Sequence, residues 1–94
     1  MVGYVERGFD AVIIARRDGE VLDFVKREGV SLNPGFFGRV AAELVGPIVD
    51  ITRMFDVSPS GMEMDFEFGG AAIKVVVDGE LLRIGVRLGR GHRR

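Results

Sequence analysis

Apolar side chains recur at steps of three or four residues in one sustained stretch of the chain, residues 33–55. That period is typical of an α-helix that buries one side. Asn33 followed by Pro34 is typical of a helix N-cap and a first helical residue. The stretch therefore predicts one long helix, with an apolar stripe formed by Phe37, Ala41, Leu44, Ile48, Ile51 and Phe55.

More apolar residues flank this stripe, and the charged residues occupy only the narrow remainder. At about 100° per residue, the apolar side chains cover an arc of about 240°. A helix that lies on one sheet needs an apolar arc of about 100° or a little more. The helix is therefore either sunk deep in its own fold, or it covers a sheet and also meets a second subunit. The flanking residues are Ala42, Val45 and Val49 on one side and Phe36, Val40 and Met54 on the other.

Gly46 and Pro47 interrupt the middle of the predicted helix. Proline has no amide hydrogen and clashes with the preceding turn, which costs about 3 kcal/mol in a straight helix. We therefore expect either a kink or two helices in line, with Pro47 beginning the second.

Two strands are predicted before the helix, over residues 9–16 and 21–26. The first carries apolar residues on both faces, which indicates an interior strand. The second includes Asp23 and Lys26, which favours an edge or half-covered position. Asp18-Gly19 between them predicts a type I′ hairpin turn, in which both residues have positive φ.

Three strands are predicted after the helix, over residues 62–68, 71–77 and 80–88. The first alternates strictly, so methionine and phenylalanine face a core while Glu63, Asp65 and Glu67 face away. Gly69-Gly70 and Asp78-Gly79 close the two hairpins. If both loops have two residues, Asp65 lies opposite Lys74, and Lys74 lies opposite Arg83. The inner face then has the rows Met64-Val75-Leu82 and Phe66-Ile73-Ile84.

The predicted order β-β-α-β-β-β indicates an α+β fold, with one helix layer on a five-stranded antiparallel sheet. The outer face of this sheet is only partly polar, because apolar side chains lie beside the predicted charged row. This mixture indicates a surface for a partner, formed by Val12, Ile14, Lys74, Val76, Leu81 and Arg83.

The composition is that of one small globular domain, with 47% hydrophobic and 29% charged residues in 94 positions. No apolar run reaches the length of a membrane span. The chain has no cysteine and no secretory signal pattern, which favours the cytoplasm. Many charges and a single amide residue, Asn33, are typical of a thermophile.

The net charge of −1 is unevenly distributed, because residues 89–94 (GRGHRR) form a basic tail that we expect to be flexible. Removing the charges of Arg90, Arg93 and Arg94 leaves −4 on residues 1–89. A body with this charge argues against a nucleic-acid-binding surface. We expect the folded core to span residues 8–88.

Candidate catalytic and metal-binding residues lack the partners that their chemistry needs. His92 is the only histidine and lies in the basic tail, so the loop serines have no nearby base. Glu63, Asp65 and Glu67 share a face as metal ligands would, but carboxylates that alternate with apolar residues are typical of a half-buried strand. Gly69-Gly70 is not followed by the residues of a phosphate-binding loop. We expect no catalytic residue, metal or cofactor, and no enzyme.

The run GFDAVIIARRDGEVLDF (residues 8–24) resembles the opening hairpin of Roadblock domains, the dynein light chain family. The later run MEMDFEF-GG-AAIKVVV-DG-ELLRIGV (residues 62–86) resembles the three-stranded meander of that family. The resemblance covers residues 8–88 and implies the sheet order 2-1-5-4-3. The sequence differs from the fuller family pattern, because no helix is predicted before the first strand or after the last one. This difference indicates a minimal version of the domain.

The resemblance implies a non-catalytic scaffold or regulator that dimerises through its central helix and third strand. Many members of the family serve small Ras-like GTPases. A homodimer or a heterodimer with a related chain is expected, with its interface formed by Phe36, Val40, Val45, Val49, Met54, Glu63, Asp65 and Glu67.

Two alternatives stay open from the sequence. The acidic strand at 62–68 is either a homodimer seam, despite its like charges, or an edge that docks a basic strand of another protein. A small-ligand-binding sensor module is the alternative function, because sheet-plus-helix folds of this size also bind ligands.

Overall fold

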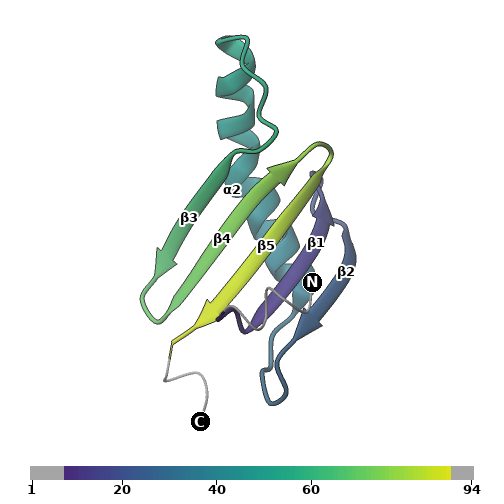
Figure 1. Ribbon diagram of the computed structural model, residues 1–94, viewed down its shortest axis with the longest axis vertical. Coiled ribbons are helices and arrows are strands. Elements are labelled where there is room, and N and C mark those ends of the chain that lie inside the picture. The colour runs from purple at the N-terminus through teal and green to yellow at the C-terminus, as the bar shows by residue number, and fades with distance from the viewer. Residues whose placement is uncertain (1–7, 90–94) are drawn as a thin grey trace.

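The computed structural model describes residues 8–89 and confirms the predicted α+β architecture. One helix packs behind an antiparallel sheet of five strands, in the order β2-β1-β5-β4-β3 that the resemblance implies (Figure 1). No described helix has the length and hydropathy that a membrane crossing requires. The elements are β1 (Ala11–Arg16), β2 (Val21–Lys26), α2 (Pro34–Met54), β3 (Glu63–Phe68), β4 (Ala71–Asp78) and β5 (Leu81–Leu88). Residues 1–7 and 90–94 lie outside this range. The predictions that the chain lacks terminal helices and ends in a flexible basic tail concern these residues.

The core lies between α2 and the inner face of the sheet. Alternate residues of the three central strands point inward and are fully buried, as a half-covered sheet requires. The fully or nearly fully buried apolar residues on the inner face of the strands are Ala11, Ile13, Ala15, Ile73, Val75, Val77, Leu82, Ile84 and Val86.

The turn between β1 and β2 differs from the predicted type I′ turn. Among the described residues near it, only Gly19 has positive φ, at 98°, so Asp18 does not take the conformation that a type I′ turn requires. The Arg16 N–H donates to the carbonyl oxygen of Glu20 over 2.8 Å. The loop therefore has three residues, with glycine at the position where a three-residue hairpin needs it.

The hairpin between β4 and β5 is shifted by one residue from the prediction. Asp78 lies directly opposite Leu81, so Gly79 and Glu80 form the loop. Lys74 consequently lies opposite Gly85, and the prediction that it faces Arg83 is wrong. The shift moves each cross-strand partner by two residues, which leaves every side chain on its predicted face.

The hairpin between β3 and β4 has the predicted register. Asp65 lies opposite Lys74, as predicted. The inner-face neighbours Met64–Val75 and Phe66–Ile73 are also confirmed, but these rows continue to Ile84 and Val86 of β5 instead of Leu82 and Ile84.

Helix α2 begins as predicted and runs without interruption through Pro47, so the alternative of two helices in line is wrong, whereas a kink at Pro47 stays a prediction. The Asn33 side-chain oxygen accepts a hydrogen bond from the Phe36 N–H over 3.2 Å, which confirms the N-cap. Pro47 lies on the exposed side of the helix. The carbonyl group that lacks its amide partner is therefore on the side where water can satisfy it.

The buried face of α2 is rotated from the predicted stripe. Its buried residues are Gly38, Ala41, Val45 and Val49, whereas Leu44 and Ile48 are only half-buried. The cause is the close approach of the helix to the β1–β2 turn. A Cβ atom on Gly38 would lie 2.6 Å from the carbonyl oxygen of Gly19. The helix can therefore approach the turn this closely only with a glycine at the point of contact. The large residues Leu44 and Ile48 therefore lie beside the buried face of the helix and not at its centre.

Candidate protein interface

One flank of α2 is polar and faces the turn between β1 and β2. Ala42, Gly46, Asp50 and Arg53 lie on it, and they line a hollow of about 160 Å³ together with Arg17 of that turn. We call these four helix residues the polar flank. The Arg53 and Asp50 side chains form an exposed ion pair at 3.8 Å. Such a surface pair contributes little to stability, so this side of the helix is an ordinary solvated surface.

The opposite flank of α2 is apolar and faces the β4–β3 side of the sheet. Val40, Leu44, Ile48, Ile51 and Phe55 follow each other at steps of three or four residues along it, and we call them the apolar flank. The first three are half-buried, whereas Ile51 is 52% exposed and Phe55 is 74% exposed. A continuous apolar stripe that becomes more exposed toward one end of the helix is typical of surfaces that contact a partner.

Strand β3 forms the sheet edge on that same side. It pairs with β4 alone among the described strands, so the backbone groups of its other edge have no strand partner there. The Lys74 ammonium lies 3.3 Å from the Glu63 carboxylate, and Asp65 and Glu67 are also exposed. On the inner face, Phe66 is half-buried and Phe68 is exposed. An unpaired edge with apolar residues on one face is suited to receive another strand.

The structure places the predicted interface residues in two different environments. Val40, Phe36 and Met54 lie on exposed or half-exposed parts of α2, and the three β3 carboxylates are exposed. Val45 and Val49 are only 2% and 4% exposed because they pack on the sheet of their own chain. Their assignment to an interface is therefore wrong. Leu44, Ile48, Ile51 and Phe55 are the half-buried or exposed apolar residues that the sequence stripe assigned to the core instead.

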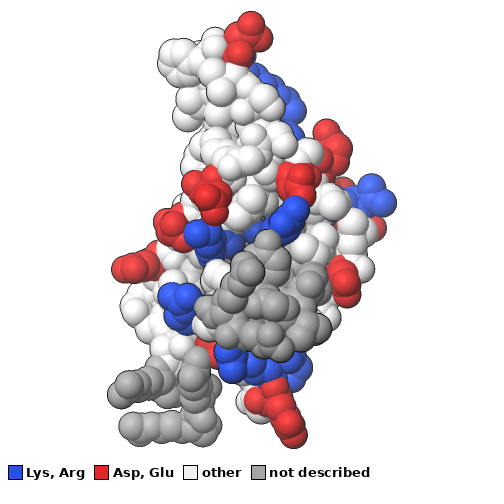
Figure 2. Space-filling model, in the orientation of Figure 1, with Lys and Arg blue, Asp and Glu red and all other residues white. Residues whose placement is uncertain are grey.

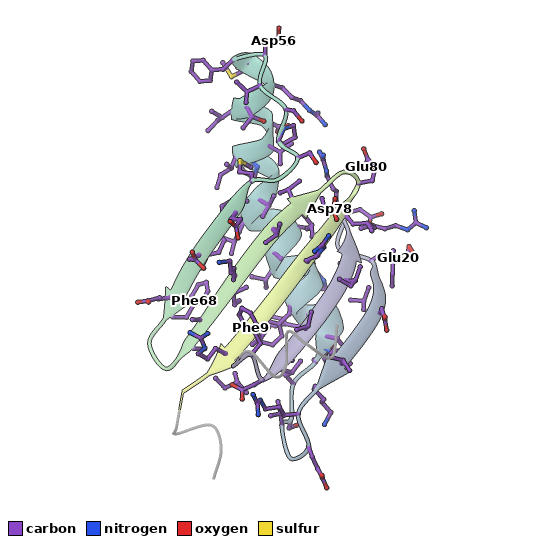
Figure 3. The ribbon with its side chains drawn as sticks, viewed as in Figure 1. Phe9, Glu20, Asp56, Phe68, Asp78 and Glu80 are labelled. Atoms are coloured by element: carbon purple, nitrogen blue, oxygen red, sulfur yellow. The ribbon has the colours of Figure 1, made fainter. Side chains whose placement is uncertain are left out.

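The outer face of the sheet contains a hollow of about 360 Å³ near the middle of β4 and β5. Gly85 has no side chain, and the Phe9 ring occupies the space next to it; a Cβ atom on Gly85 would lie 2.6 Å from that ring (Figure 3). Charged residues of both signs are scattered over this face (Figure 2). The residues that line the hollow are Phe9, Val12, Glu63, Lys74, Val76, Arg83, Ile84 and Gly85.

Four of the six predicted outer-face residues meet at this hollow, namely Val12, Lys74, Val76 and Arg83. Ile14 and Leu81 do not line it. Val12 is only 2% exposed at this hollow, and its predicted contact with a partner stays a prediction. Arg83 forms an ion pair with Asp78 instead of extending a row with Asp65 and Lys74, because the β4–β5 register differs from the predicted one.

A buried carboxylate at the start of β1 was not identified from the sequence. Asp10 is almost completely buried, and its Oδ2 accepts a hydrogen bond from the Leu88 N–H over 2.7 Å. The Arg27 Nε lies 3.8 Å from its Oδ1 and also donates to the Phe9 carbonyl oxygen over 3.0 Å. The Arg87 guanidinium lies 5.4 Å from the centre of the Phe9 ring. These contacts fix residues 8–10 to the sheet, so Asp10 has a structural role that strand alternation alone does not reveal.

Within residues 8–89, no group of histidine, cysteine, aspartate or glutamate side chains has an arrangement that could hold a metal ion. The buried side-chain nitrogen and oxygen atoms of this range all have hydrogen-bond partners. His92 lies outside it. Among the described residues, the surface considered further is therefore the apolar flank of α2 together with the free edge of β3.

Solved structures with a similar arrangement of strands and helix include a Roadblock-type domain. MglB from Myxococcus xanthus matches with a TM-score of 0.72 and 8% identity, over 98% of this chain and 77% of that chain. A Roadblock/LC7 domain from Streptomyces avermitilis matches with a TM-score of 0.72 and 13% identity, over 96% of this chain and 76% of that one. This chain has the Roadblock fold.

MglC from Myxococcus xanthus also matches, with a TM-score of 0.57 and 11% identity, over 96% of this chain and 78% of that chain. No protein-family model matches the sequence, and no curated protein matches it either. With identities this low, the likeness concerns the fold. In the Roadblock fold of this chain, the free edge of β3 and the apolar flank of α2 lie on the same side.

Proposed function

We propose that this chain is a non-catalytic scaffold that dimerises through α2 and β3 and binds protein partners, with a small Ras-like GTPase as the first candidate. The observation that carries the proposal is the apolar flank of α2 beside an unpaired sheet edge. The Roadblock fold supports it, because domains of this family commonly dimerise and serve small GTPases. One similar solved structure is described as MglB with tetrameric arrangement, which also supports association of several copies.

In the proposed dimer, β3 pairs antiparallel with β3 of a second copy, and the two sheets become continuous. The apolar flanks of the two helices then lie on the same side of the joined sheet and cover each other. Pairing centred on Asp65 sets Asp65 against its own copy and Glu63 against Glu67 of the other chain. Like charges directly opposite are unfavourable, and the Lys74–Glu63 ion pair offsets only part of this cost.

A related chain with a basic third strand would relieve that repulsion, which is the heterotypic form of the same proposal. Both forms use the same edge and the same helix flank. They differ in their response to salt, because screening favours an acidic self-paired edge and weakens an acidic edge paired with a basic one.

Two measurements test the proposal. Light scattering at micromolar concentration should give about twice the chain mass of 10.3 kDa, or a mixed dimer when the related chain is added. Immobilised protein should then retain a Ras-like GTPase, identified by mass spectrometry, from extract supplied with either GDP or a non-hydrolysable GTP analogue. Retention that depends on the nucleotide supports the GTPase partner. A persistent monomer with no GTPase retained in either state would contradict the proposal.

The hollow on the outer face supports a second candidate function, a ligand-binding sensor module. Its lining includes the apolar Val12 and Val76 and the cations Lys74 and Arg83, for which a ligand would compete with the carboxylates of Glu63 and Asp78. A small anion with an apolar body is the class of ligand that fits such a lining. Amide chemical shifts that cluster around Gly85 during titration with aliphatic carboxylates would favour this function, whereas unchanged shifts would exclude that ligand class.

A further inference from the structure

The sheet has a second free edge, at β2. Among the described strands, β2 pairs with β1 alone, and it lies at the opposite side of the sheet from β3 (Figure 1). A dimer formed through β3 would therefore have a β2 edge at each end of its joined sheet. If β2 also paired with another copy, the two kinds of contact would alternate and the assembly would grow without closing. The β2 edge therefore determines whether association through β3 stops at two copies.

The charges of β2 would permit it to pair with a second copy of itself. The strand (VLDFVK) has one acidic and one basic residue. Antiparallel pairing centred on Phe24 sets Asp23 opposite Val25 of the second copy, and no like charges meet within the strand. Pairing of β3 with its own copy sets Asp65 against Asp65, which is unfavourable. On charge alone, β2 is therefore the better of the two strands for self-pairing.

Alternate residues of β2 direct their backbone groups to the free edge. The Arg27 N–H donates to the Asp10 carbonyl oxygen over 2.8 Å, so the backbone of Arg27 points toward β1. Because the direction alternates along a strand, the backbone groups of Phe24 and Lys26 point outward. Pairing centred on Phe24 would require each Phe24 N–H to donate to the Phe24 carbonyl oxygen of the other copy.

The outward amide of Phe24 already has an acceptor within its own chain. The Phe24 N–H donates to Asp23 Oδ1, and the two heavy atoms lie 2.8 Å apart. A side-chain acceptor competes with a neighbouring strand for the same amide hydrogen. An incoming strand must therefore displace the Asp23 carboxylate before it can pair at the centre of this edge.

A bulge also shortens the part of β2 that another strand could use. The register between β1 and β2 shifts between Ile14 and Ala15, which leaves Leu22 as an extra residue. A bulge twists an edge strand and interrupts its pairing. Strand β3, by contrast, keeps an unbroken register with β4 over its six residues. The regular part of the β2 edge is therefore residues 23–26, which contain the Phe24 amide.

We propose that Asp23 blocks the β2 edge against pairing with a second copy of β2, by holding the amide hydrogen of Phe24. The block depends on β2 alone. Only its consequence, that association stops at two copies, rests on the proposed dimer through β3. The two sheet edges then have different roles, because β3 is available to another strand and β2 is not.

Asp23→Ala removes the acceptor and tests the block. Sedimentation velocity over a range of micromolar concentrations measures the size of the assemblies. If the unmodified chain is a dimer, the variant should form assemblies of more than two copies, with association through β2 strengthened about tenfold or more. Circular dichroism verifies that the variant is folded.

Two controls separate the hydrogen bond from the charge. Asp23→Asn keeps an oxygen acceptor at the same position without the charge, so it should have the size of the unmodified chain. Asp18→Ala removes a similar contact, because Asp18 Oδ1 accepts from the Glu20 N–H over 2.9 Å, but in the turn before β2. It should also leave the size unchanged. Equal growth of either control would overturn the proposal, because loss of charge would then explain the assemblies.

The outcomes distinguish this block from the proposed dimer. If the unmodified chain is a monomer, which contradicts the dimer, Asp23→Ala should still associate through β2. If Asp23→Ala has the size of the unmodified chain at every concentration, the block is wrong and the dimer stands. Open-ended growth of the unmodified chain would also contradict the block.

Hydrogen exchange of the Phe24 amide, followed by NMR, gives a readout that does not depend on assembly. At a concentration too low for assembly, this amide should exchange about tenfold faster in Asp23→Ala than in the unmodified chain. If Asp23→Ala does not fold, the unmodified chain alone gives the answer. A Phe24 amide that exchanges there as fast as in an unstructured peptide would show that Asp23 does not hold it, and the inference would fail.

Discussion

The two flanks of α2 border the same buried face but have opposite chemistry. The polar flank has Asp50 and Arg53 exposed as an ion pair, beside a turn of the chain's own sheet. The apolar flank has no charged residue and runs toward a free strand edge. Monomeric proteins rarely leave a contiguous apolar stripe uncovered. The difference supports the proposal that the polar flank faces solvent and that the apolar flank faces a partner.

The largest effect is expected from a charge on the buried face between the two flanks. Val49→Asp places an unpaired carboxylate where the native side chain is 4% exposed. We expect the free energy of unfolding to fall by about 4 kcal/mol or more, enough to unfold a small domain. Thermal denaturation followed by circular dichroism would measure this. A folded Val49→Asp monomer that has only lost its dimer would show that Val49 belongs to the interface after all.

Two glycines of the helix distinguish its buried face from its polar flank. Gly38→Ala should destabilise the fold by about 1–3 kcal/mol, because the added methyl group would lie 2.6 Å from the Gly19 carbonyl oxygen. Gly46→Ala is the matched control, since no atom lies within 4 Å of its added methyl group. It should stabilise the helix by about 0.5–1 kcal/mol. Urea denaturation gives the free energy of unfolding of both variants. Equal changes in the two would contradict the assigned rotation of α2.

A smaller effect is expected at the acidic edge. Glu63→Gln combined with Asp65→Asn removes like charges that a self-paired β3 brings together, so the homodimer should tighten several-fold. Raising the salt concentration should tighten the unmodified homodimer in the same direction. Sedimentation equilibrium at two ionic strengths measures both. Weaker self-association of the variant would exclude self-pairing around Asp65, and loss of a captured basic partner would indicate the heterotypic edge.

Much of the fold follows from local patterns that the sequence displays directly. The strict alternation before Gly69-Gly70 specifies β3, its inner face and its register with β4, because strand side chains have a period of two. Asn33-Pro34 marks the start of α2 in the same way. The sheet order was not evident from these patterns and came from the resemblance to the Roadblock family.

The site was predicted less well, because it depends on contacts between distant parts of the chain. The predicted stripe follows the largest apolar residues of the helix, so the predicted buried face is centred on Leu44 and Ile48. The actual rotation depends on Gly38 meeting Gly19 of the β1–β2 turn, a contact that no period within the helix encodes. The burial of Asp10 likewise depends on the distant Leu88 and Arg27.

The most direct test of the central claim is sedimentation equilibrium of Ile51→Asp beside Arg53→Asp. Each variant adds one aspartate at an exposed position of the same helix turn, on the apolar and the polar flank respectively. If the apolar flank is the interface, Ile51→Asp should raise the dimer dissociation constant about 100-fold, because the substitution occurs twice in a two-fold dimer. Arg53→Asp should leave the dissociation constant nearly unchanged. Both variants should retain the circular dichroism spectrum of the unmodified chain. Equal dissociation constants for the two variants would contradict the account.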